Sequence, residues 1–206
     1  MSPVEEAAAQ PTYFVLRAAP SIESERAAED GYMEIEDWKK TEGFEDWSVG
    51  RPAARRPEGP VEIDVVPYLD YRGGPDEFLD LNVPLMSKRL KETIQAAGVD
   101  NVNFHPVTLR NTVTGETYEY FAFNLIGLVD AVDPGQSNIT SHDGDFLGDS
   151  SITDLAVDEE AARGLLMFRL KQKFSVILVH RKVKEAVERV GIPSVRFIAP
   201  QDFMAL

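Results

Sequence analysis

The pattern of apolar and polar residues predicts many short strands and few helices. Residues 13–16 (YFVL) are aromatic and β-branched, which favours a strand. Residues 61–65 (VEIDV) alternate apolar and polar side chains, as a strand with one buried face does. Residues 118–128 are rich in aromatic side chains and predict a central strand. Further runs bring the expected total to about eight strands and about two to four helices; they cover residues 152–157, 165–170 and 175–179.

One stretch of this pattern occurs twice, because residues 85–104 can be laid over residues 178–197 without a gap, at an offset of 93. Each copy predicts a strand, a helix with apolar positions every three to four residues, a glycine suited to a left-handed C-cap, and a second strand. Ser87 suits the N-cap of the first helix, whereas His180 or Arg181 is a poorer cap for the second. We therefore expect a repeated scaffold unit here. Identical pairs are Leu85/Leu178, Lys91/Lys184, Glu92/Glu185, Gly98/Gly191, Val102/Val195 and Phe104/Phe197.

Turn signals complete the prediction of the fold. Residues 111–117 (NTVTGET) have hairpin turn chemistry, and Asp133-Pro134-Gly135 ends a strand. Strands outnumber helices and neighbours are hairpin-like, which favours an α+β fold with a mixed, largely antiparallel sheet and two quasi-repeated strand–helix–strand units. We expect residues 1–60 to form an acidic, partly irregular segment that packs on an α+β domain at 61–206, the two making a single compact domain.

Composition narrows the range of functions. The chain has 206 residues, 43% of them hydrophobic, and no cysteine, which excludes disulfides, thiolate metal ligands and a cysteine nucleophile. It contains no apolar run long enough for a transmembrane helix, and Glu5 and Glu6 stand where a signal peptide would carry basic residues. We therefore expect a cytoplasmic protein.

The net charge of −14 is unevenly distributed. Residues 130–160 contain nine acidic residues and no Lys or Arg, while residues 161–206 contain nine basic and three acidic residues. A surplus of carboxylates disfavours nucleic acid as a partner. Two interpretations of the acidic segment remain open: it faces the basic C-terminal segment, or it faces a basic partner protein.

Motifs of catalysis are missing from the sequence. There is no nucleophile elbow and no glycine-rich phosphate loop, and the three histidines fall in separate segments. Residues 142–149 (HDGDFLGD) resemble a calcium loop, but Leu147 occupies a ligand position and the final bidentate Glu is missing. A solvated loop is favoured, so we expect no enzyme activity, no cofactor and no bound metal. A small metal-dependent hydrolase that uses His142, Asp143 and Asp145 is the alternative.

Four further features follow one another along the chain: residues 85–104, the run 123–133 with Ser137, the pair Phe168-Arg169, and residues 176–203. In their order and spacing these segments resemble the bacterial Imm-eleven immunity family. The resemblance covers about residues 60–203, with a departure at His180-Arg181, where the family has a Ser-Glu-like helix start. It implies a non-catalytic bacterial protein, encoded beside a toxin, that binds and neutralises that toxin. A sister hypothesis is an inhibitor of a co-produced protease or secreted effector.

Charge suggests where such a partner would bind. A carboxylate-rich face suits a basic toxin such as a nuclease. Asp130 and Asp133 could instead cap or turn the chain. Trp38 and Trp47 are alternative anchors, because aromatic side chains dominate interfaces, unless they pack over the core. The acidic candidates are Asp130, Asp133, Asp143, Asp145, Asp149, Asp154, Asp158, Glu159 and Glu160.

Overall fold

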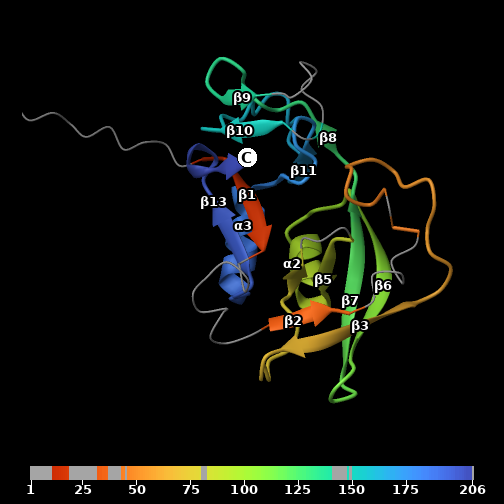
Figure 1. The fold of residues 1–206 in the computed structure, drawn as a ribbon. Coiled ribbons are helices and arrows are strands. Elements are labelled where there is room, and N and C mark those ends of the chain that lie inside the picture. The colour runs from red at the N-terminus through yellow and green to blue at the C-terminus, as the bar shows by residue number, and fades with distance from the viewer. Residues whose placement is uncertain are drawn as a thin grey trace, which may run out of the picture.

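A computed structural model describes residues 11–18, 32–36, 43–44, 46–79, 83–140, 148 and 150–205. In these residues the chain forms strands β1 to β14, helices α2 and α3, and a short 3₁₀ helix, η2 (Figure 1). Their bounds are β1 Tyr13–Ala18, β2 Tyr32–Ile35, β3 Val61–Tyr68, β4 Phe78–Leu79, β5 Leu85–Ser87, α2 Lys88–Ala96, β6 Val102–Asn111, β7 Thr117–Leu125, β8 Leu128–Val129, β9 Asn138–Thr140, β10 Ser151–Thr153, β11 Met167–Leu170, β12 Ile177–His180, α3 Arg181–Val190, β13 Val195–Ile198, η2 Pro200–Asp202 and β14 Met204–Ala205.

The strands form three sheets. A six-stranded sheet has the order β2-β3-β6-β7-β5-β4, a five-stranded sheet the order β13-β1-β12-β11-β8, and a small sheet the order β14-β10-β9. Most neighbours are antiparallel, and only β3–β6 and β8–β11 are parallel. The predicted α+β class with a mixed, largely antiparallel sheet is therefore confirmed. None of the described helices is both long and apolar enough to cross a membrane.

Local sequence patterns located most of these strands. The predicted strands at 13–16 and 61–65 lie in β1 and β3, and the predicted hairpin turn joins β6 to β7. The strand expected over 118–128 is divided: β7 ends at Leu125, and β8 pairs with β11 in the other sheet. The strand expected over 152–157 ends at Thr153, because Asp154 has a φ of 53° and so leaves the extended conformation.

The two predicted strand–helix–strand segments are β5–α2–β6 and β12–α3–β13, and both have the same topology. In neither do the two strands pair with each other. Instead they flank a third, antiparallel strand, which is β7 in the first unit and β1 in the second. The register also corresponds, since Phe121 lies opposite Met86 and Phe14 lies opposite Val179. The order β6-β7-β5-β4 thus matches β13-β1-β12-β11 strand for strand.

Equivalent polar contacts recur in the two units. The Tyr120 hydroxyl donates a hydrogen bond to the Asp76 carbonyl (3.0 Å), and the Tyr13 hydroxyl donates one to the Leu165 carbonyl (3.0 Å). Ser87 caps α2 by accepting a hydrogen bond from the Leu90 amide, as expected. His180 takes the same place at α3, where its Nδ1 accepts from the Lys182 amide (3.1 Å), so the residue predicted to be a poorer cap does occupy the N-cap.

A glycine with a left-handed conformation follows the C-terminal end of each helix. Gly191 is the left-handed C-cap of α3, with φ 71° and ψ 55°, as predicted. In α2 the C-cap is Ala97, and Gly98 follows it with a φ of 102°. The left-handed glycine therefore falls at the equivalent position in the two units, and α2 ends one residue earlier than α3.

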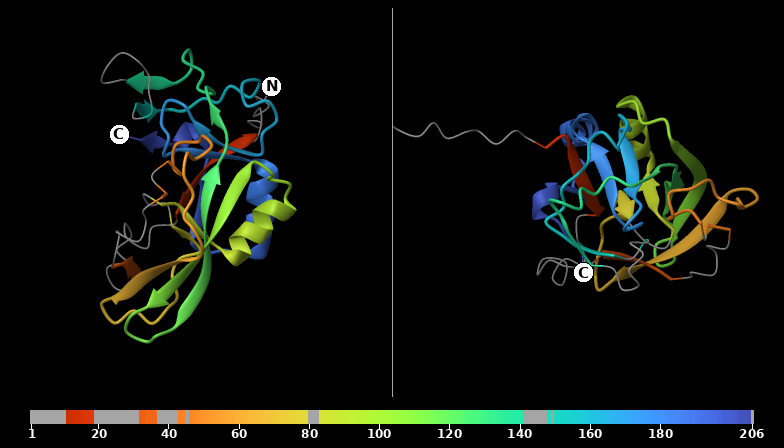
Figure 2. Two further views of the ribbon diagram at one scale, coloured as in Figure 1. Left: turned by 90° about the vertical axis from the view of Figure 1, so that its right-hand side faces the viewer. Right: turned by 90° about the horizontal axis from the view of Figure 1, so that it is seen from above.

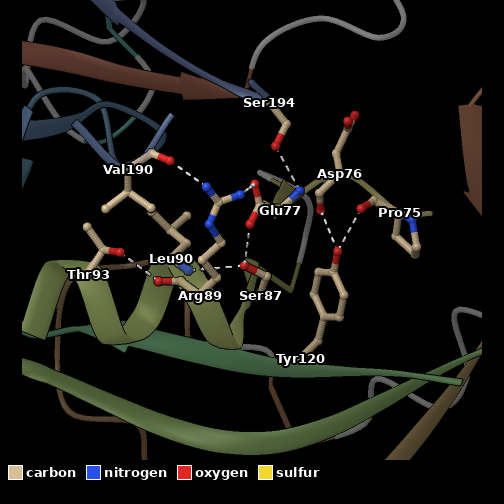
Figure 3. Close-up of polar contacts among 10 residues, drawn as sticks. All are labelled: Pro75, Asp76, Glu77, Ser87, Arg89, Leu90, Thr93, Tyr120, Val190 and Ser194. Atoms are coloured by element: carbon tan, nitrogen blue, oxygen red, sulfur yellow. Dashed lines mark hydrogen bonds and ion pairs between the residues drawn. The ribbon is translucent and has the colours of Figure 1, made fainter. Parts of the chain in front are cut away.

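The two units pack together through reciprocal contacts between α2 and α3. Arg89 in the first turn of α2 donates to the carbonyl of Val190 at the end of α3 (Figure 3). Lys182 in the first turn of α3 lies beside Gly98 after α2. Each cation thus approaches the carbonyl end of the opposite helix, where its charge is favourable. This reciprocity places the units about an approximate two-fold axis between the helices.

A second pair of hydrogen bonds joins the units beyond the helices. In the second unit, Ser194 Oγ accepts a hydrogen bond from the Glu77 amide of the first unit (2.8 Å; Figure 3). Asn101, the counterpart of Ser194 in the first unit, donates from Nδ2 to the Met167 carbonyl of the second unit (2.9 Å). One apolar cluster contains side chains from both units, among them Leu90, Phe123 and Val183. The two units therefore share a core.

Candidate functional site

The acidic segment, residues 130–160, follows β8 and contains β9 and β10. Its described part lies at one end of the molecule (Figure 1). It includes Asp130, Asp133, Asp154, Asp158, Glu159 and Glu160. Asp143, Asp145 and Asp149 lie outside the described residues, as do His142 and Trp38. The candidate metal loop and one of the two candidate tryptophans therefore remain predictions.

Several carboxylates of this segment bind their own chain. Asp130 forms an ion pair with Lys171 (3.1 Å), which lies in the basic C-terminal segment. Asp133 accepts a hydrogen bond from the Gly135 amide (2.8 Å), and Asp158 accepts from the amides of Glu160 and Ala161. Part of the acidic segment thus stabilises turns and faces the C-terminal segment, as the intramolecular interpretation predicts. Asp154 likewise accepts from Asn138 Nδ2 (3.1 Å).

Glu159 and Glu160 are exposed. The pKa of Tyr13 is raised above its usual value, mainly because its phenol is partly buried and secondly because of the negative charge of Glu159. These two side chains are the described members of the segment best placed to meet a partner.

Trp47 is a core residue. Only 1% of it is exposed, and its ring meets Phe44 edge-on, with 4.9 Å between the ring centroids. These two rings belong to one apolar cluster with Ile63, Val65 and Leu109, which lie on one face of the six-stranded sheet. The side chain is therefore not accessible as an interface anchor, and the alternative of packing over the core is the correct one for this residue.

On the opposite face of the six-stranded sheet, the described side chains beyond α2 are exposed or half-buried. Along β3 the side chains of Ile63 and Val65 point into the core, so Glu62, Asp64, Val66 and Tyr68 lie on the other face. The paired strands add the residues opposite these positions. We name this surface the open face; it consists of Tyr32, Glu34, Glu36, Glu62, Asp64, Val66, Tyr68, Thr108, Arg110, Thr117 and Glu119.

Carboxylates dominate the open face. Arg110 lies between Asp64 (2.7 Å) and Glu62 (3.3 Å), and its hydrogen bond to Asp64 raises its pKa further above the usual value. Glu119 pairs with Lys88 at the start of α2 (3.2 Å). The described residues contain no ion-pair partner for Glu34 or Glu36, both of which are exposed. Five carboxylates against Arg110, even with the neighbouring Lys88 of α2, leave the surface negative.

Aromatic and apolar side chains lie at the far end of the open face. The rings of Tyr32 and Tyr68 stack with 4.9 Å between centroids, and Tyr68 is 45% exposed. Leu69 follows, 59% exposed and with a φ of 55°, which is unusual for a bulky side chain. Val113, 68% exposed, lies in the β6–β7 turn, and the Thr112 amide binds the Val65 carbonyl, so this turn lies at the same end of the sheet.

The sequence prediction did not identify this surface. The alternation at 61–65 indicated that Glu62 and Asp64 point away from the core. However, the residues that join them come from β2, β6 and β7, and only the strand pairing brings these together. No local signal in the sequence reports that pairing.

A groove of about 510 Å³ lies between α2 and α3. Arg89, which lines the groove, forms an ion pair with Glu77 and donates a hydrogen bond to the Val190 carbonyl (Figure 3). The groove therefore belongs to the joint between the two units. Its lining consists of equivalent pairs, namely Arg89/Lys182, Glu92/Glu185, Thr93/Ala186, Ala96/Arg189 and Ala97/Val190. The described residues contain no group of three or more His, Asp or Glu side chains arranged to hold a metal ion.

Comparison with known proteins places this fold in a family. No curated protein matches the chain. A family model described as "Immunity protein family (Imm11)" matches residues 5–202, which extends the expected resemblance into the N-terminal segment that supplies β1 and β2. Since the match spans nearly the whole sequence, the chain belongs to the Imm11 immunity protein family.

Proposed function

We propose that this protein is a non-enzymatic immunity protein that binds and neutralises a cognate bacterial toxin in the cytoplasm. The observation that carries the proposal is the family match over residues 5–202. The net charge of −14 supports a basic toxin as the partner, for example a nuclease, because complementary charge speeds encounter and favours the correct partner.

Inhibition in this proposal requires only a stable complex. The acidic segment contributes mainly through its field, because Asp130, Asp133, Asp154 and Asp158 already accept hydrogen bonds or pair within the chain. Glu159 and Glu160 are exposed, and together with the candidates Asp143, Asp145 and Asp149 they attract a basic partner. Charges at such positions chiefly change the association rate.

The experiment uses the protein encoded by the neighbouring gene as the probe. It is produced in cells with and without this protein, and the two purified proteins are then mixed. Toxicity that is relieved by co-production, together with a stoichiometric complex, would support the proposal. A neighbouring protein that neither harms cells nor binds would contradict it, and a neighbouring protease would favour the sister hypothesis of a protease inhibitor.

Charge reversal tests the acidic segment. Asp143→Lys/Asp145→Lys/Asp149→Lys should slow association with the neighbouring protein about tenfold at low ionic strength and flatten the salt dependence of the rate, because long-range attraction is lost. Stopped-flow or surface plasmon resonance kinetics at several salt concentrations provide the measurement. An unchanged association rate would show that this segment does not contribute to encounter.

A further inference from the structure

We propose that the cognate toxin docks on the open face, with Tyr32 and Tyr68 as its anchors and a basic protein surface as the partner. This inference rests on the proposed function and names the surface that carries it out. It moves the main contact away from the acidic segment, which is the candidate that charge alone had indicated.

The open face presents aromatic and apolar side chains at one end. Interfaces are enriched in tyrosine, and a few buried aromatic anchors carry most of the binding energy. Tyr32 and Tyr68 are already stacked on neighbouring strands, so little side-chain entropy is lost when a partner covers them. Among the described residues, the large apolar side chains with the highest exposure are Tyr68, Leu69, Val113, Val190 and Met204, and the first three lie at this end of the sheet.

Carboxylates lie beside these aromatic side chains. Glu34 and Glu36 extend from the tyrosines along β2, while Glu62 and Asp64 hold Arg110 on the adjacent strand. A partner that presents Lys or Arg would find carboxylates around an apolar centre, and a cation over the stacked tyrosine rings would gain a further attraction. An acidic partner would be repelled by the same surface. Charge complementarity therefore selects the basic face of a protein.

Most of the open face lies outside the two related units. The two related units account for β4 to β7 and for their counterparts β11, β12, β13 and β1. Among the residues that the structure describes, strands β2 and β3 have no counterpart in the second unit, and together with Glu36 they supply both tyrosines and most of the carboxylates. These strands and the end of the β6–β7 hairpin lie at the end of the molecule opposite β9 and β10 (Figures 1 and 2). The open face and the acidic segment can therefore be tested separately.

The test measures binding of the full-length chain to the neighbouring gene's protein by surface plasmon resonance. Tyr32→Ala/Tyr68→Ala should raise Kd at least tenfold, mostly through faster dissociation. Glu34→Lys/Glu36→Lys should slow association about tenfold at low salt.

Two controls change residues outside the open face. Asp100→Lys/Asp202→Lys changes the net charge by the same amount at exposed positions, and Met204→Ala truncates an exposed apolar side chain. Both controls should change Kd less than threefold.

The outcomes separate the two proposals. If the wild-type protein binds and both open-face variants bind equally well, the open face is not the docking site, whereas the proposed function stands. If the wild-type protein does not bind, both proposals fail. If light scattering shows a wild-type dimer that Tyr32→Ala/Tyr68→Ala dissociates, the face joins two copies of this chain and the inference is overturned. Circular dichroism of each variant confirms that a loss of binding is not a loss of folding.

Discussion

Tyr13 and Tyr120 are equivalent residues that lie in the middle strands of the two related units. Burial is the main cause that raises the pKa of both phenols above the ordinary value of 10.0. Each hydroxyl also donates to a backbone carbonyl and is held there in its neutral form. Alkaline pH therefore acts on the fold through these two side chains.

We expect the free energy of unfolding to fall as pH rises above 10.0. Below that pH both phenols are neutral in the folded and the unfolded chain, so they cause no pH dependence. Above it the unfolded chain loses protons that the folded chain retains, which favours unfolding. Denaturant titrations between about pH 8 and about pH 11 measure the slope. Tyr13→Phe/Tyr120→Phe should make it shallower, and an unchanged slope would contradict the assignment.

Ser87 provides a second test at the level of a single residue. Its Oγ accepts from the Leu90 amide (3.1 Å) and donates to Glu77 (3.3 Å), so it caps α2 and links it to the preceding segment. Ser87→Ala should lower the free energy of unfolding by about 1 kcal/mol and Tm by about 2–4 °C. Ser87→Thr should retain most of the stability, and Ser175→Ala at an exposed position is the control. A thermal melt equal to that of wild type would exclude a capping role.

Helices α2 and α3 illustrate what local sequence can and cannot predict about elements. Their apolar spacing, N-caps and terminal glycines are short-range signals, and both helices lie where these signals placed them. The hairpin at 111–117 is local too, since Asn111 Oδ1 accepts from the amides of Val113 and Thr114. The pairing of β1 with β12 and β13 is not local, because the partners are more than 150 residues apart in the chain.

The joint between the units gives a prediction at the scale of elements. Asn101 Nδ2 donates to the Ile126 carbonyl (2.7 Å) and the Met167 carbonyl (2.9 Å), whereas its counterpart Ser194 accepts one hydrogen bond from Glu77. Asn101→Ala should therefore cost about 2 kcal/mol and Ser194→Ala about 1 kcal/mol in the free energy of unfolding. Denaturant melts should show one transition in each case, because the units share a core. Two separate transitions would show instead that the units unfold independently.

The candidate site was only partly predictable at the scale of the whole molecule. Charge counting located the acidic segment, but the structure uses Asp130, Asp133 and Asp158 for an ion pair and for turns. The open face escaped prediction because its members are spread from residue 32 to residue 119. A surface made of four strands becomes visible only when the order of those strands is known.

The middle strand β1 allows a test of the whole architecture. It lies between β12 and β13 and buries Tyr13, Val15 and Leu16, each worth about 1.5–3 kcal/mol. Their sum is comparable with the total stability of a typical domain, about 5–15 kcal/mol. A chain that begins at residue 19 should therefore fail to fold, whereas a chain that begins at residue 11 should fold like the full-length protein. Circular dichroism and denaturant titration distinguish the two.

In the first unit the equivalent middle strand, β7, follows β6 directly through a hairpin. The equivalent middle strands β7 and β1 are thus connected differently to their neighbours in the two units. A permuted chain in which residues 19–206 are followed by a flexible Gly/Ser linker and residues 11–18 should regain the cooperative unfolding transition. The same permuted chain with Val15→Asp and Leu16→Asp should not regain it, because both side chains are buried. If the permuted chain stays unfolded while the chain beginning at residue 11 folds, the two middle strands are not interchangeable in their connection, and the correspondence between the units does not extend to the way they fold.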